Sequence, residues 1–203
     1  MNASLFIAYL VTITVLMLTP GPDMLFCLAT GLKSGPRAGM LAAAGAATGE
    51  IVHIAAAGLG LAALFRSAPA LFDAVRLVGA AYLVFLGLQA IRHRHAGIGG
   101  KTAARRESRA YLRGLMTNLL NPKMALFTIA FLPQFVDPAR NVPVQFVVLG
   151  ACFVTVEILV DGTVGVLAGR FHALLGRPRS RRNLNIAAGT VFLGLGARVA
   201  LER

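Results

Sequence analysis

Two short proline-containing segments hold the residues of this sequence that are best suited to binding a small polar molecule. The first is Thr19-Pro20-Gly21-Pro22-Asp23, and the second is Asn118-Leu119-Leu120-Asn121-Pro122-Lys123. Proline lacks a backbone N–H and clashes with the carbonyl one turn earlier, so these segments should interrupt helices and free backbone carbonyls and amides. The alternative for the first segment is a kink that serves only helix packing. The candidate substrate-binding residues are Thr19, Pro20, Gly21, Pro22, Asp23, Asn118, Asn121, Pro122 and Lys123.

Six ionisable residues fall within or beside long apolar runs. A charge near the centre of a bilayer costs roughly 2.5 to 3.5 kcal/mol on insertion scales, so such residues usually face a partner or a water-filled cavity. They are also typical of proton and ion pathways. Besides Lys123, the set consists of the candidate proton-coupling residues, Asp23, Glu50, His53, Glu157 and Asp161.

Glu157 and Asp161 lie four residues apart, so they share one face of a helix. Two unpaired negative charges there would repel each other, and we expect one of the two acids to hold a proton, which makes the pair a candidate proton relay. The alternative is that each acid lies near the membrane interface and is simply solvated. Glu50 and His53 have helical spacing and could bond to each other, but His53 could equally donate to a neighbouring carbonyl.

The sequence does not point to an enzyme, a cofactor or a metal. It contains no nucleophile elbow, zinc-protease motif, P-loop or dinucleotide-binding fingerprint. Cys27 and Cys152 stand in apolar runs without a CxxC spacing, and we expect both to be buried free thiols. The ligand set that a metal site would need is missing from the pattern.

The elements that position these residues are predicted to be membrane-spanning helices. The chain has 203 residues, of which 57% are hydrophobic and 14% charged, and its mean hydropathy is +0.72. A soluble domain of this length could not keep so many apolar residues out of water. A helix needs about 20 mostly apolar residues to cross a bilayer, and six runs approach that length. They are residues 5–18, 40–65, 77–91, 115–131, 144–167 and 186–201.

We therefore predict an all-α membrane protein with a single transmembrane domain, residues 1–203, made of two inverted three-helix repeats. Repeat one covers about residues 1–96, a basic cytoplasmic loop covers 97–113, and repeat two covers 114–203. Three helices are an odd number, so the second repeat must enter the membrane from the opposite face. The first and fourth helices are the proline-broken ones. Aligning Pro22 with Pro122 pairs Asp23 with Lys123, which predicts an ion pair or a shared water network near the membrane midplane.

The positive charge indicates topology rather than nucleic-acid binding. The formal net charge is +12, and fourteen basic residues fall in the first, third and fifth loops, against five on the other face. By the positive-inside rule these loops are cytoplasmic and both termini lie outside. The first apolar run lacks a basic leader and a signal-type cleavage site, and we expect it to be retained as a span.

The residues above, taken together, resemble the LysE/RhtB family of amino-acid exporters over essentially the whole chain. The resemblance rests on the two proline segments, on Gly45-x-x-x-Gly49, on Phe131-Leu132-Pro133-Gln134-Phe135 and on Glu157 in the fifth run. It implies proton-driven efflux of an amino acid or close derivative, such as threonine, homoserine, leucine, lysine or arginine, across a bacterial inner membrane. It does not imply acids at Glu50 and Asp161, so these two are candidates for tuning the substrate or the ion.

Two questions about function stay open at this point. Lys123 and a protonated carboxyl favour a neutral amino acid over lysine or arginine, with the substrate held between the broken helices and moved by alternating access. The other classes that fit a membrane protein with buried charges are an ion or metal exporter of similar architecture and a non-transporting membrane scaffold. The expected partners are the substrate, protons and lipid, without nucleic acid, and small-residue faces such as that of Gly45 and Gly49 leave a homo-oligomer open.

Overall fold

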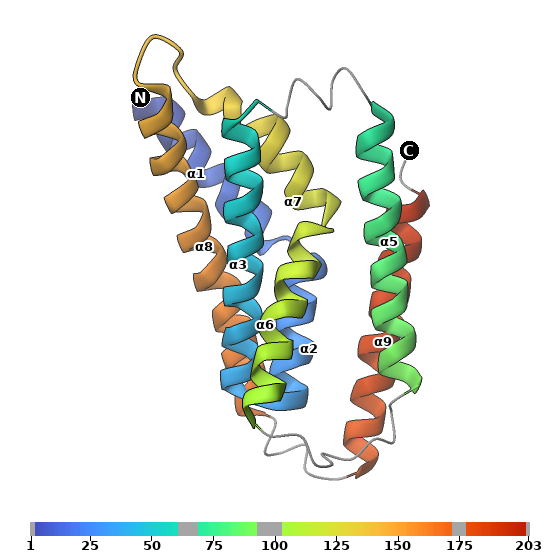
Figure 1. The fold of residues 1–203 in the computed structure, drawn as a ribbon. Coiled ribbons are helices and arrows are strands. Elements are labelled where there is room, and N and C mark those ends of the chain that lie inside the picture. The colour runs from blue at the N-terminus through green and yellow to red at the C-terminus, as the bar shows by residue number, and fades with distance from the viewer. Residues whose placement is uncertain (1–2, 61–68, 93–102, 172–177, 202–203) are drawn as a thin grey trace.

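The computed structural model describes residues 3–60, 69–92, 103–171 and 178–201, and these residues are almost entirely helical (Figure 1). Within them there is no strand, which agrees with the predicted all-α class. The order is α1 (Ala3–Leu18), α2 (Pro22–Ser34), α3 (Pro36–Gly58), α5 (Pro69–Arg92), α6 (Ala103–Leu119), α7 (Pro122–Leu126), the π-helix η1 (Phe127–Phe131), the 3₁₀-helix η2 (Leu132–Phe135), α8 (Val142–Arg170) and α9 (Pro178–Leu201).

Two to four segments of the described chain are long and apolar enough to cross a membrane. Helices α3 and α8 qualify alone, and two bent pairs qualify if each pair is one span. The bent pairs are α1 with α2 and residues 107–135, which include most of α6 together with α7, η1 and η2. The predicted second run, 40–65, continues past α3 into residues outside the described part. The count of six spans and the inverted repeat stay predictions.

The two predicted helix breaks occur at the prolines. Helix α1 ends at Leu18 and α2 begins at Pro22, with a bend of 50° between them. Residues 107–119 and 122–135 meet at 51°. In each case proline occupies the first turn of the helix that follows, where its missing N–H leaves no bond unmade. The residues before these prolines, Gly21 and Asn121, are extended, which ends the preceding helical path.

Helix α3 packs against both α6 and α8 through small residues. A methyl group added at Gly45 would lie 2.0 Å from the carbonyl oxygen of Tyr111 in α6, and one at Gly114 would lie 2.1 Å from that of Ala42 in α3. The same close approach joins α2 to α8, because a methyl group at Gly31 would lie 2.1 Å from the carbonyl oxygen of Gly165. The predicted packing role of Gly45 is confirmed, and these contacts bring the backbones close enough to enclose polar side chains between the helices.

Helices α5 and α9 pack along each other and stand beside the other helices (Figure 1). Their contact with the rest of the chain includes the tilted ring pair Phe26 and Phe192, with centroids 6.3 Å apart. Leu83 and Leu86 of α5 join the same buried apolar cluster. This cluster attaches the α5 and α9 pair to α2 and α3.

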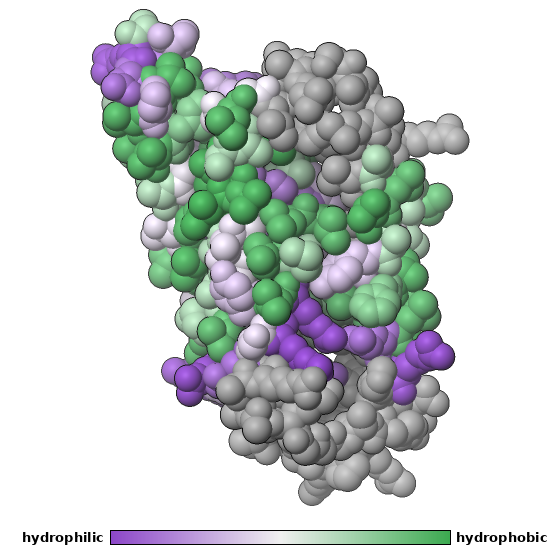
Figure 2. Space-filling view, in the orientation of Figure 1, coloured by the Kyte–Doolittle hydropathy of each residue, from purple (hydrophilic) through white to green (hydrophobic). Residues whose placement is uncertain are grey.

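The outer surface of the described chain is apolar where a bilayer would contact it. Figure 2 shows hydrophobic side chains over most of the described middle of one face, with hydrophilic ones mainly towards its ends. On α1, four large apolar side chains are 58 to 62% exposed. They are Ile7, Val11, Val15 and Leu18, and their spacing of three or four residues places them on one side of the helix. Such a face is stable against lipid.

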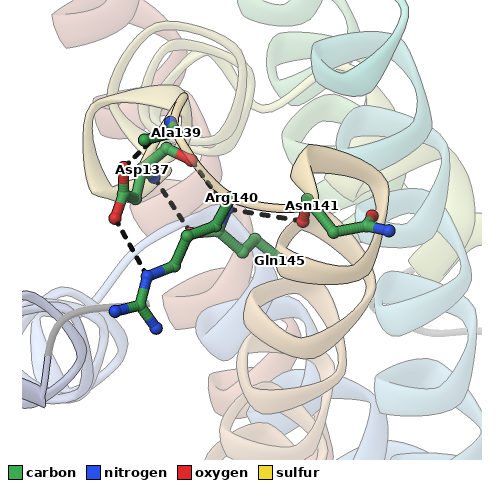
Figure 3. Close-up of polar contacts among 5 residues, drawn as sticks. All are labelled: Asp137, Ala139, Arg140, Asn141 and Gln145. Carbon is green, nitrogen blue, oxygen red and sulfur yellow. Dashed lines mark hydrogen bonds and ion pairs between the residues drawn. The ribbon is translucent and has the colours of Figure 1, made fainter.

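The described loop between η2 and α8 is closed by paired hydrogen bonds (Figure 3). The Asp137 N–H donates to Gln145 Oε1 and Gln145 Nε2 donates to the Asp137 carbonyl, both at 2.9 Å. The Asp137 carboxylate pairs with Arg140 Nε at 3.3 Å, and Asn141 Oδ1 accepts from the Val144 N–H to cap α8. The loop therefore holds the start of α8 at a fixed position relative to the end of η2.

The glycine contacts between α3 and α6 predict a local stability effect. We expect Gly45→Ala to lower the stability of the purified protein by about 1 to 3 kcal/mol, because its methyl group would overlap the Tyr111 carbonyl and force the helices apart. Thermal unfolding in detergent measures the change. Gly194→Ala is the matched control, because nothing lies within 4 Å of the added methyl group in α9. Equal melting temperatures for the two variants would contradict the close approach.

Candidate functional site

The two helix breaks meet in one small pocket. Gly21 is buried at the first break, and a methyl group added there would lie 3.1 Å from Nζ of Lys123, which follows the second break. The pocket therefore lies between the two halves of the chain. Its polar lining comes from Thr19, Gly21, Asp23, Asn121, Lys123 and Asp161, and its apolar lining from Met17, Met24 and Met124.

Asp23, at the start of α2, is held by two amides from the other broken span. Its Oδ2 accepts from Asn121 Nδ2 at 2.7 Å and from Asn118 Nδ2 at 3.3 Å. The same Asn118 nitrogen donates to Glu157 Oε1 in α8 at 2.9 Å. Since the amide carries two hydrogens, one can point to each acid. Asn118 therefore bridges the carboxylates of α2 and α8.

Lys123 is bound by the carbonyls that the first break frees. Its Nζ donates to the carbonyl oxygens of Leu16 and Thr19, both at 3.0 Å. The last carbonyls of a helix carry partial negative charge, so an ammonium group is stabilised there. Asp23 and Lys123 line the same pocket, yet the described residues contain no direct ion pair between them. Of the predicted ion pair or water network, the direct ion pair is therefore wrong, because the ammonium bonds to carbonyls instead.

Glu50 and His53 of α3 bond to different partners. Glu50 Oε1 accepts from the hydroxyl of Thr128 in the π-helix η1. His53 Nε2 lies 3.2 Å from the carbonyl oxygen of Asn118, a contact in which the ring nitrogen donates. Of the two alternatives for His53, the structure has the bond to a neighbouring carbonyl, and in the described part of the chain Glu50 and His53 have separate partners.

Four buried oxygen atoms at the site lack any hydrogen-bond donor within the described residues. All four are acceptors, and three belong to acids. A buried polar atom without a partner costs free energy, so such atoms often mark the place of a ligand or a proton. A group with several N–H or O–H donors would satisfy them. The atoms are Asp23 Oδ1, Glu50 Oε2, Asn118 Oδ1 and Glu157 Oε2.

Most of the residues predicted from the sequence lie in or beside the pocket, but Pro20 is exposed and does not line it. Asp161 is 2% exposed and lines the pocket, so it is not a solvated interface residue in this structure. Glu157 is fully buried as well. The sequence reasoning missed Thr128, the partner of Glu50, although a polar residue within the apolar run 115–131 was a signal for it. It also missed the Leu16 carbonyl, because a backbone partner has no sequence signal.

A helical membrane protein in which two broken helices and buried acids surround one polar pocket has the features of a membrane transport protein. Comparison with known families identifies the family. Residues 14–203 match the model of the LysE type translocators, and the chain belongs to this family. No solved structure matches the chain.

Curated relatives align over nearly their full length. The homoserine/homoserine lactone efflux protein of Salmonella typhimurium (strain LT2) is 36% identical over 198 residues, which cover 97% of this chain and 96% of the relative. The leucine efflux protein of Klebsiella pneumoniae is 34% identical over 201 residues, or 96% and 94% of the two chains. An uncharacterized membrane protein of Vibrio cholerae is 34% identical over all of both chains. The family and these names point to a membrane transporter rather than an enzyme.

The side chain of Asn121 makes two hydrogen bonds, and a second helix-capping asparagine that makes only one of them allows their energies to be separated. Its Oδ1 accepts from the Lys123 N–H as a helix cap, and its Nδ2 donates to Asp23. We expect Asn121→Ala to cost about 2 to 4 kcal/mol, from a lost cap of about 1 and a lost bond of about 1 to 3 to a buried carboxyl oxygen that keeps only the longer bond from Asn118.

The matched control is Asn141→Ala, which removes an exposed cap of the same type from α8. It should cost only about 1 kcal/mol. Thermal unfolding of both purified variants measures the difference. If the two variants lose the same stability, the bond from Asn121 to Asp23 contributes nothing.

Proposed function

We propose that this protein is a secondary transporter that exports a neutral amino acid or a close derivative across a bacterial inner membrane, with protons moving inward. The observation on which this depends is the pocket between the two helix breaks, which is lined by one cation, two acids and, at Asp23 Oδ1, an unsatisfied acceptor. The curated relatives named for efflux of homoserine and of leucine support this substrate class. They also favour a transporter of amino acids over an ion exporter or a scaffold.

The pocket offers complementary groups to the two charged ends of an amino acid. The ammonium group has three donors, and Asp23 Oδ1 is a buried acceptor without a partner among the described residues. The carboxylate would lie near the Lys123 ammonium and the N-terminal end of α2, both of which favour negative charge. With Asp161 holding the proton that we expect on one member of the Glu157 and Asp161 pair, Lys123 and Asp23 balance a zwitterion, which is why we favour a neutral substrate.

The inverted repeat is the basis of the proposed alternating access. The bends of 50° and 51° are nearly equal, and Pro22 and Pro122 begin the helices that follow them. The remaining helices align with one constant shift, because Val84-Phe85-Leu86-Gly87 in α5 recurs as Val191-Phe192-Leu193-Gly194 in α9, 107 positions later. With α5 and α9 included, each half would contribute three spans. Rocking one half against the other would then expose the pocket to each side in turn.

Proton coupling is assigned to the buried acids around the pocket. Asp23 and Asp161 line it, and Glu157 is joined to Asp23 through Asn118. A proton that binds to these groups would compete with the substrate ammonium for the same oxygen atoms. Such competition is a simple way to exchange protons for substrate. Glu50 and His53 belong to the same buried group through Thr128 and the Asn118 carbonyl.

The distribution of charge supports cytoplasmic basic loops. Helix α1 begins and α9 ends at one end of the described helices in Figure 1, while α5 and α8 end, and α6 and α9 begin, at the other. Residues 92–113 and 170–182, which comprise these helix ends and the stretches between them, contain twelve of the twenty basic residues. The positive-inside rule then places that end in the cytoplasm and the termini outside.

Efflux from intact cells tests the proposed transport. We expect cells that express the protein to export preloaded radiolabelled leucine or homoserine faster than control cells, and a protonophore to abolish the difference. Asp23→Asn and Lys123→Met should each lower the rate at least about tenfold, because each removes one charge from the pocket and a loss of about 1.4 kcal/mol is a factor of ten.

The control variant is Asp137→Asn, which removes a carboxylate from the loop before α8, outside the pocket. It should export at the rate of the unmodified protein. Equal expression of all variants in the membrane fraction must be established by immunoblot. Full activity of both pocket variants would rule out the proposed site. Efflux that the protonophore does not reduce would rule out proton coupling.

The orientation is tested by labelling single cysteines. With Cys27 and Cys152 replaced by alanine, we expect Asn141→Cys to react with a membrane-impermeant maleimide in intact cells, because this exposed residue lies in the loop predicted to be outside. Arg170→Cys, at the exposed end of α8, should react only after the membrane is permeabilised. The opposite labelling pattern would reverse the orientation.

A further inference from the structure

Glu50 and Glu157 occupy equivalent positions in α3 and α8. Each helix has a proline in its first turn, and Glu50 follows Pro36 by 14 residues, as Glu157 follows Pro143. The shift between the two glutamates is 107 positions, which is the shift that also relates α5 to α9. One helix from each half of the chain thus has a glutamate at the same number of residues from its first-turn proline.

The residues next to the two glutamates match as well. The sequences are Thr48-Gly49-Glu50-Ile51 and Thr155-Val156-Glu157-Ile158. Each threonine hydroxyl donates to the carbonyl one turn earlier, Thr48 to Ala44 at 2.9 Å and Thr155 to Ala151 at 2.7 Å. An acid in an apolar helix is costly, so its recurrence in the same local pattern indicates a role that both halves share.

Both glutamates have the same hydrogen-bonding state. Each is 0% exposed. Each accepts one bond at Oε1, Glu50 from Thr128 and Glu157 from Asn118. In each, Oε2 is buried without a donor among the described residues. One proton on each Oε2 would remove the negative charge from the site, and a hydrogen ion is the smallest ligand that an enclosed oxygen atom can bind.

Acids outnumber cations around the two glutamates. Glu50 lies near Tyr9 of α1, Asp23 of α2, the Asn118 amide of α6 and Glu157 of α8, with Thr128 of η1 as its bonded partner. Glu157 also interacts with Asp23, Asp161, the Cys27 thiol and, more distantly, the Lys123 ammonium. Among the described residues, neither glutamate has a basic side chain within ion-pair distance. Unpaired carboxylates in such a place are strongly disfavoured.

We propose that Glu50 and Glu157 are twin proton-binding sites, one in each half, so that two protons enter the cell for each substrate molecule exported. Each site takes one proton from the outer aqueous phase to form a carboxylic acid and releases it to the cytoplasm to restore the carboxylate; no other bond changes. This inference rests on the proposed function, because it assigns the number of protons to the same exchange.

The two sites differ in their link to the substrate pocket. Asn118 connects Glu157 directly to Asp23, which lines the pocket. Glu50 is bonded to Thr128 and lies near the Asn118 amide, and neither Glu50 nor Thr128 lines the pocket. Loss of Glu50 should therefore remove one of the two protons and leave substrate exchange in place, whereas loss of Glu157 should uncouple transport.

The stoichiometry is measurable in proteoliposomes that contain the full-length protein, with radiolabelled leucine and homoserine as probes. At zero membrane potential, clamped with potassium and valinomycin, the pH gradient that stops net flux is determined for a set substrate gradient. For two protons per neutral substrate, about a tenfold proton gradient should balance about a 100-fold substrate gradient, because each tenfold ratio is equivalent to 1.4 kcal/mol. For Glu50→Gln the balancing substrate gradient should fall to about tenfold.

Two further variants complete the test. Glu107→Gln removes a carboxyl at the basic end of α6. Net flux through this variant should stop at the same proton and substrate gradients as for the unmodified protein. Glu157→Gln should still exchange labelled for unlabelled substrate but should not respond to the pH gradient. Gel filtration shows which variants are folded, and if Glu50→Gln is not, the balance of the unmodified protein alone decides between one proton and two.

The outcomes that would overturn the twin sites differ from those that would overturn the proposed function. An unmodified protein that balances at about tenfold, or a Glu50→Gln variant that still balances at about 100-fold, would leave proton antiport intact and remove the second site. If a sodium gradient, and not the pH gradient, sets the substrate gradient at which net flux stops, the two sites bind sodium ions and not protons. No flux of either probe under any gradient would overturn the proposed function itself.

Discussion

The side chain of Asn121 joins the two broken spans, and the arrangement of the polar core depends on it. Its oxygen caps the helix that follows the second break, and its nitrogen bonds to Asp23 at the start of the helix that follows the first. Lys123, two residues later, returns to the carbonyls at the end of α1. Each break therefore supplies partners for the other. Interrupted helices are stable at membrane depth only when protein or a cavity satisfies their free groups in this way.

Small residues allow this polar core to be enclosed. Gly45 and Gly114 bring α3 and α6 into backbone contact, and Gly31 and Gly165 do the same for α2 and α8. Apolar side chains are no more stable against each other than against lipid tails, so close packing and hydrogen bonds must hold such helices together. The glycine contacts provide the packing, and the bonds among acids, amides and hydroxyls provide the rest. The result is a polar site between helices whose outward faces are largely apolar along the described middle of the protein.

Several features of the site were predictable from single residues. The prolines predicted both helix breaks, and acids in apolar runs predicted the buried cluster, because each of these residues has a large local cost unless the structure compensates for it. Asp161 shows the limit of this reasoning. Its position in the sequence fits the membrane interface as well as a pocket, and only the packing of α8 shows that it is buried. The partners of Lys123, His53 and Glu50 were not predictable, because they include backbone carbonyls and a threonine that lies 78 positions from Glu50.

By itself, then, the sequence determined the helical membrane class, the positions of the breaks, the residues of the candidate site and the resemblance to the family that the comparisons bear out. These follow from composition, from the geometry of proline and from the cost of burying charge, which are local properties. The tertiary structure alone decided which acid bonds to which amide, that the ammonium of Lys123 binds carbonyls rather than Asp23, and that Glu50 and Glu157 each keep one buried oxygen atom without a donor among the described residues. Those pairings depend on distances between helices, which the packing of glycines sets and no local pattern specifies.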